Sequence, residues 1–133
     1  MDRKYIVSSF IYAMLGMALG IFMAASKNHA EHVTHAHILL AGFVLSFIYG
    51  LCHKLWLNNN ASLLAKAQFL LHQFGVAIMS AGLFLLYGGF VAADVLDPVL
   101  GLSSIAVLIG MVLMTILFLQ SFKTQAAAIR GAN

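Results

Sequence analysis

Four long apolar stretches constrain the fold of this 133-residue chain more than any other feature. They cover about residues 5–25, 35–56, 67–90 and 99–122. An α-helix rises 1.5 Å per residue, so about 20 apolar residues cross the ~30 Å hydrocarbon core of a bilayer. A membrane-spanning strand would need strict alternation over about 10 residues, and the sequence has none. We therefore predict an all-α fold in which residues 1–133 form a single domain of four transmembrane helices.

The composition agrees with a membrane location. The chain is 62% hydrophobic and only 8% charged, whereas soluble domains carry roughly 25% charged residues. A soluble protein of this composition would have no polar face to present to water. The chain is therefore expected to be an integral, multi-pass four-helix bundle with the lipid bilayer as its partner. Its basic residues lie at helix ends, so they do not indicate nucleic acid.

The distribution of these basic residues predicts an orientation. Lys27 falls in the first loop, whereas the other six Lys and Arg fall on the opposite side, namely Arg3, Lys4, Lys54, Lys66, Lys123 and Arg130. Cytoplasmic loops carry the excess of Lys and Arg in membrane proteins. Both termini are therefore predicted to be cytoplasmic, and the first and third loops are predicted to face outward.

Four histidines lie within nine residues in and after the first loop: His29, His32, His35 and His37. The last two open the second apolar stretch, where an ionisable side chain is costly and usually functional. Because they are two residues apart, a regular helix places their rings about 200° apart. Both rings cannot bind one ion from one helix, so at most one faces the bundle interior and the other faces a neighbouring chain, water or lipid. Lipid would leave the imidazole unpaired, so the geometry favours an oligomer in which the second ring meets a partner subunit.

A second grouping gives a different prediction. His29, His32 and His35 are spaced by three, and they would share one face if the second helix began early. Imidazole ligands suit copper and zinc, so this row could form a metal site at the outer face. The simpler interpretation of His29 and His32 is a hydrated loop without a metal.

The two remaining histidines lie deeper in the chain. At 1.5 Å per residue, His72 and His37 differ in height by roughly 15 Å, so they are not expected to bind one iron within one chain. We expect His72 either to bind a cofactor or to hydrogen-bond a neighbouring helix. His53 adjoins Lys54 and Trp56, which are typical membrane-interface anchors, and we interpret it as interfacial.

The run His-Ala-His-Ile-Leu-Leu-Ala-Gly-Phe at 35–43 resembles an early helix of the NnrS family of haem- and copper-containing membrane proteins. It is similar also to helix two of the haem–copper oxidase catalytic subunit, where a histidine binds low-spin haem. The whole chain resembles small four-helix bacterial proteins of the cytochrome c oxidase subunit I-like superfamily. These also show Leu-His followed by Gly in helix three, here at 71–75.

This resemblance implies a haem b protein. His37 best matches the position of the haem ligand, and His35 is the next candidate. His72 matches the histidine of helix three in these proteins, whose role the resemblance does not assign. The resemblance implies electron transfer, redox chemistry or O2/NO binding, an electron donor as partner, and a location in the bacterial inner membrane with the histidines facing the periplasm. Oxidoreductase activity stays open. The oxidase subunit resembles three four-helix arcs, so a four-helix chain is expected to close as a homotrimer.

The chain also departs from the oxidases. It has four helices rather than twelve, and it lacks a His-His pair for the oxidase copper centre, so oxygen reduction coupled to pumping is not expected. Two alternatives to haem binding stay open from the sequence. One is copper or zinc handling at the periplasmic face, and the other is an accessory membrane subunit without a cofactor.

Overall fold

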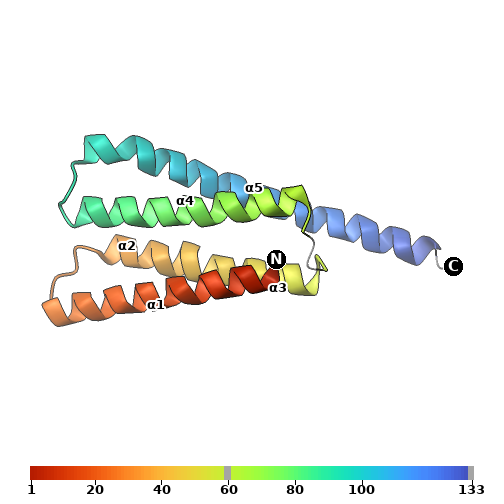
Figure 1. Cartoon of the computed structure of the whole chain (residues 1–133), viewed down its shortest axis with the longest axis horizontal. Helices are drawn as coiled ribbons and strands as arrows, with labels where there is room; N and C mark the ends of the chain where they lie inside the picture. The colour runs from red at the N-terminus through yellow and green to blue at the C-terminus, as the bar shows by residue number, and fades with distance from the viewer. Residues whose placement is uncertain (59–60, 132–133) are drawn as a thin grey trace.

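The computed structural model describes residues 1–58 and 61–131, with side chains described as far as residue 123. The described residues form helices joined by short turns and no strand, which confirms the all-α prediction (Figure 1). The elements in chain order are α1 (Asp2–Ser26), α2 (His32–His37), η1 (Ile38–Val44), α3 (Leu45–Leu55), α4 (Leu63–Tyr87) and α5 (Ala93–Gly131). Because α2, η1 and α3 follow one another without a break, they act as one composite helix.

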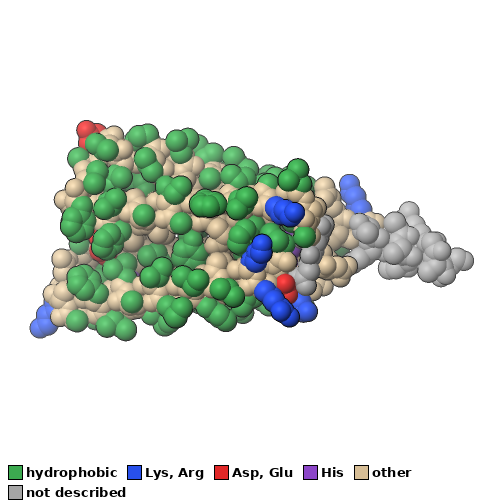
Figure 2. Space-filling model, in the orientation of Figure 1, with side chains coloured by type: hydrophobic (Ala, Val, Ile, Leu, Met, Phe, Trp, Pro, Cys, Tyr) green, Lys and Arg blue, Asp and Glu red, His purple; other side chains and the backbone are tan. Residues whose placement is uncertain are grey.

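Four of the resulting rods are long and apolar enough to cross a membrane: Asp2–Ser26, His32–Leu55, Leu63–Tyr87 and Ala93–Lys123. Their outer surfaces are covered with hydrophobic side chains (Figure 2). Phe10, Met14 and Ile21 of α1, for example, are 52%, 60% and 70% exposed. Such a surface would be unfavourable in water but matches hydrocarbon. The structure thus agrees with a multi-pass membrane protein.

The rods pack as two antiparallel pairs. Helix α1 lies along η1 and α3, α4 lies along α5, and contacts of α4 with α2 and η1 join the pairs (Figure 1). The start of α1, the end of α3 and the start of α4 lie at one end, which we call the basic end. Lys and Arg side chains gather there (Figure 2). The α1–α2 and α4–α5 loops lie at the other end, which we call the histidine end.

Local signals define the ends of α4. The hydroxyl of Ser62 caps the helix by accepting a hydrogen bond from the backbone N–H of Ala65 at 3.2 Å, so α4 begins earlier than residue 67. It ends at Tyr87, before the predicted residue 90, because Gly88 and Gly89 follow. Gly89 has a φ of 72°, a left-handed conformation that glycine adopts without strain.

Helix α5 begins at Ala93, earlier than the predicted residue 99, and includes Pro98. Proline lacks an N–H and its ring crowds the carbonyl four residues earlier, so the effect of Pro98 falls on the carbonyl of Asp94 in the first turn. The negative charge of Asp94 in the first turn also favours the positive end of the helix dipole. These terms let the helix extend through Pro98 to the loop.

Glycines bring the helices together. A Cβ atom at Gly20 of α1 would lie 2.9 Å from Cε1 of His35, and Gly16 similarly faces the side chain of Leu39. On α4, a Cβ atom at Gly75 would lie 3.1 Å from the backbone oxygen of Ser103 in α5. Small residues permit such close backbone approach in membranes.

The composite helix contains a π-helical segment, η1, directly after His35 and His37, which we call the rim histidines. A π-helix has a wider turn than an α-helix, and such segments often occur at functional sites. Within η1, Gly42 lies against the ring of Tyr12, and a Cβ there would come 2.6 Å from Cγ. The segment therefore lets α1 approach closely while it changes the register between His37 and the residues of α3.

Candidate functional site

His35 of α2 is held by α1. Its Nδ1 atom lies 2.9 Å from the backbone oxygen of Gly16. A carbonyl oxygen can only accept, so Nδ1 carries the hydrogen and Nε2 carries a lone pair. Nε2 makes no hydrogen bond within the described part of the chain. The absence of a side chain at Gly20 provides the space in which the ring lies.

His37 has the same tautomer for a different reason. Its Nδ1 atom lies 2.8 Å from the backbone oxygen of Val33, one turn earlier on the same helix, so Nε2 again carries the lone pair. The ring lines a shallow depression whose other walls are Ala36, Leu40 and Ala41, all from its own composite helix. His37 therefore faces away from the bundle, whereas His35 faces α1, as their spacing in the sequence predicts.

His29 and His32 lie at the histidine end. Helix α2 begins at His32, so His29 precedes the helix, and both side chains are exposed. The Nδ1 atom of His32 hydrogen-bonds the backbone oxygen of His29 at 3.0 Å. Among the residues that the structure describes, no group of three or more His, Cys, Asp or Glu is placed to hold a metal. A copper or zinc site at His29, His32 and His35 thus stays a prediction that this conformation does not assemble.

His72 is fully buried in α4. Its Nε2 atom is 3.2 Å from the hydroxyl of Ser46, which also accepts a hydrogen bond from the amide of Gln73 at 3.0 Å. The Ser46 hydroxyl keeps its proton and a second lone pair, so the direction of its bond to Nε2 is set by the tautomer of His72. Ser46 lies nine residues after His37, which is about 13 Å along the helix. His72 thus lies far below the rim histidines, and its Nε2 atom is already engaged.

His53 lies near the end of α3, with its side chain buried inside the bundle. It is 0% exposed and stacks on the ring of Tyr5, with 5.6 Å between the ring centroids. Neither of its nitrogens has a hydrogen-bond partner among the described residues. The Tyr5 hydroxyl donates to the side-chain oxygen of Gln68. Tyr49 makes edge contacts with both Tyr5 and His72, at centroid distances of 5.6 and 4.8 Å.

His53, Tyr5, Gln68 and Tyr49 form a series of buried contacts that leads from the basic end toward His72 in the middle of the bundle. We call this series the buried polar chain. The sequence does contain the signal for it. Ser46, Tyr49 and His53 are spaced by three and four residues, and Gln68 and His72 by four, so each set occupies one helix face. Polar residues at such spacing within apolar helices favour bundle contacts, and the structure brings the two faces together.

No family model, curated protein or solved structure matches this chain. The fold alone therefore defines its class, an α-helical multi-pass membrane protein with four rods able to span the bilayer. Three histidines at the histidine end, His32, His35 and His37, place Nδ1 on a backbone carbonyl and keep an unused Nε2 lone pair. Of these, His35 and His37 are partly buried, whereas His32 is exposed.

Proposed function

We propose that this chain is a haem b-binding membrane protein in which His35 and His37 provide axial ligands through Nε2. The observation that carries the proposal is the pair of Nδ1 hydrogen bonds to the backbone oxygens of Gly16 and Val33. Metal-bound histidines commonly donate their other ring N–H to a carbonyl, which fixes the tautomer and orients the ring. The Nε2 atom of each ring is therefore available to bind an iron, which is the role that we propose for it.

The iron would be shared between copies of the chain. Because His35 faces α1 and His37 faces outward, one chain does not present both rings to one iron. We propose a closed homotrimer in which His37 of each chain meets His35 of its neighbour. The resemblance of residues 35–43 to haem–copper oxidase and NnrS helices supports the same arrangement.

The favoured role is electron transfer. Bound haem would supply one-electron chemistry, with a potential set by its axial ligands and surroundings. The carbonyl of Gly16 holds the ring of His35 and raises its basicity, while the apolar rods exclude water from the site. Two imidazoles would fill both axial positions, so binding of O2 or NO would require one ligand to leave. An electron donor is the expected partner.

The orientation follows from the charges. We propose that the basic end is cytoplasmic and the histidine end periplasmic, in a bacterial inner membrane. A reporter fused after Asn133 tests this: green fluorescence is expected from a fluorescent protein there, whereas alkaline phosphatase at the same position is expected to be inactive. An active phosphatase fusion would contradict the proposed orientation.

The haem proposal is tested by absorption spectroscopy of the detergent-purified protein. Wild type should show a Soret band and reduced-minus-oxidised changes, and His35→Ala and His37→Ala should each lose most of this absorption. His29→Ala is the matched control, because His29 is exposed and precedes α2, and it should keep the full spectrum. Circular dichroism checks that every variant is helical.

Three outcomes would contradict the proposal. If the His35→Ala and His37→Ala variants fold and keep full haem, neither histidine is a haem ligand. A colourless wild type with stoichiometric copper or zinc would favour the metal-handling function. A folded wild type that binds neither haem nor metal would favour an accessory subunit.

A further inference from the structure

Ser80 of α4 differs from the other described serines and threonines. Most of their hydroxyls donate to a carbonyl of the preceding turn, as Ser9 does to Ile6 at 2.7 Å and Ser103 to Leu100 at 2.9 Å. Ser80 as a residue is 8% exposed, and its hydroxyl oxygen is buried. Within the described side chains it is the one Ser or Thr hydroxyl without a hydrogen bond. A buried donor is rarely left unpaired in this way.

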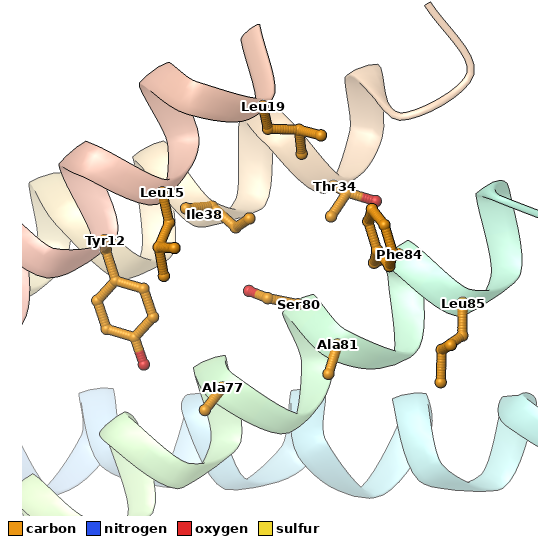
Figure 3. A pocket seen from close by; sticks show the side chains of 10 residues that line it. All are labelled: Tyr12, Leu15, Leu19, Thr34, Ile38, Ala77, Ser80, Ala81, Phe84 and Leu85. Atoms are coloured by element: carbon orange, nitrogen blue, oxygen red, sulfur yellow. The ribbon is translucent and has the colours of Figure 1, made fainter. Parts of the chain in front are cut away.

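The Ser80 hydroxyl points into a cavity between α1, the composite helix and α4 (Figure 3). The cavity has a volume of about 510 Å³, which is a typical size for a small-molecule site. The rings of Tyr12 and Phe84 lie on either side of the hydroxyl (Figure 3). The remaining walls are mainly aliphatic, including Leu15, Leu19, Ile38, Ala77 and Ala81.

The other two hydroxyls of this cavity are already engaged. Tyr12 donates to the backbone oxygen of Gln73 at 3.1 Å, and Thr34 donates to the carboxylate of Glu31 at 2.6 Å. Ser80 is therefore the single hydroxyl of the cavity that is left to donate to a ligand. An occupant that matches the cavity is mostly apolar and carries one hydrogen-bond acceptor.

The depth of Ser80 in the membrane limits the kinds of molecule that can occupy the cavity. Ser80 precedes Tyr87 by seven residues, so it lies about 10 Å from the end of α4. The 25 residues of α4 span about 37 Å, which is more than the ~30 Å hydrocarbon core. The hydroxyl is thus within the acyl-chain region, where phospholipid tails offer no acceptor. The bound molecule must therefore carry its own hydrogen-bond acceptor, such as a carbonyl, at the depth of the acyl chains.

We propose that this cavity binds a membrane-soluble ring carbonyl compound of the quinone class. The hydroxyl of Ser80 donates to a ring carbonyl, Tyr12 and Phe84 flank the ring, and the apolar tail extends into the lipid. The inference rests on the cavity and not on the proposed haem ligation. Thr34 and Ile38 of its wall adjoin His35 and His37 in the chain, so the bound molecule would lie beside the proposed haem ligands.

The test measures binding of decyl-ubiquinone to the protein in quinone-free nanodiscs, with empty nanodiscs as the partition control. Wild type should bind saturably. Ser80→Ala should weaken binding roughly fivefold, as expected for the loss of one hydrogen bond. Ala77→Leu, which fills the cavity, should abolish saturable binding. Ser103→Ala is the matched control, because its hydroxyl is bonded within α5, and it should bind as wild type does.

A second probe separates the hydrogen bond from simple partitioning. Decylbenzene has a ring and a tail but no carbonyl, so its binding should not change in Ser80→Ala. Unsaturable binding by wild type, unchanged affinity in Ser80→Ala, or equal affinity for decylbenzene would each overturn the quinone site.

Discussion

At the scale of single residues, hydrogen bonds divide the six histidines into distinct chemical environments. The rim pair, His35 and His37, use Nδ1 and keep Nε2 available. His72 uses Nε2 with Ser46, and His53 is buried without a partner among the described residues. An imidazole binds a metal through a lone pair. His32 also keeps Nε2 available but is exposed, so the partly buried rim pair is the one that we propose as ligands.

The Ser46 hydroxyl should matter for stability more than for haem. Ser46→Ala removes the partner of both His72 and the Gln73 amide, and unpaired buried polar groups cost about 1–3 kcal/mol each. We expect a lower thermal midpoint in detergent with unchanged haem per chain. Thr115→Ala is the control, because Thr115 is exposed and its hydroxyl donates to the backbone oxygen of Met111 in its own helix. A midpoint equal to wild type would show that the Ser46 contacts contribute nothing.

His53 should respond in the opposite direction. Because neither ring nitrogen has a described partner, His53→Leu removes two unsatisfied atoms and keeps an apolar contact with Tyr5. Replacing unpaired polar groups by apolar ones is often neutral or stabilising. The thermal midpoint is therefore expected to stay level or rise. A fall as large as that of Ser46→Ala would indicate that His53 has an essential partner.

At the scale of helices, close packing of α1 on α2 positions His35. Gly20→Ala would place a Cβ 2.9 Å from Cε1 of His35, so the ring has to turn and strain its bond to Gly16. We expect reduced haem content and a shifted Soret band. Gly101→Ala is the matched control, since nothing lies within 4 Å of its Cβ position, and it should leave the spectrum unchanged. An unchanged spectrum in Gly20→Ala would contradict the positioning role.

The sequence predicts the helices better than their details. Hydrophobic length is a local property, so four spans follow from the sequence alone. Within the π-helical turn of η1, Gly42 contacts Tyr12. This contact joins distant parts of the chain and leaves no local pattern in the sequence. Likewise, the spacing of His35 and His37 fixes their opposed directions, whereas the burial of His53 depends on Tyr5 of another helix.

At the scale of the whole molecule, the chain separates two kinds of polar feature. The buried polar chain of His53, Tyr5, Gln68 and Tyr49 runs from the basic end toward His72, whereas the rim histidines lie at the opposite end. Between them the outer surface is apolar (Figure 2). A single chain thus presents two of its imidazoles at one level of the membrane, which is what an assembly of several copies needs to share a cofactor.

The proposed assembly should be visible by native mass spectrometry from detergent. We expect a trimer for wild type, because His37 of one chain and His35 of the next would be joined through iron. His35→Ala should dissociate more readily, while His29→Ala should stay trimeric. A monomer that still carries a full complement of haem would contradict the shared site.

The iron coordination of the purified wild-type oligomer tests the central claim most directly. Electron paramagnetic resonance of the oxidised protein is expected to show low-spin haem with two imidazole ligands, and this signal should be lost or become high-spin in His37→Ala. Wild-type protein from haem-replete cells that contains no haem, and takes up none when haem is added, would contradict the account.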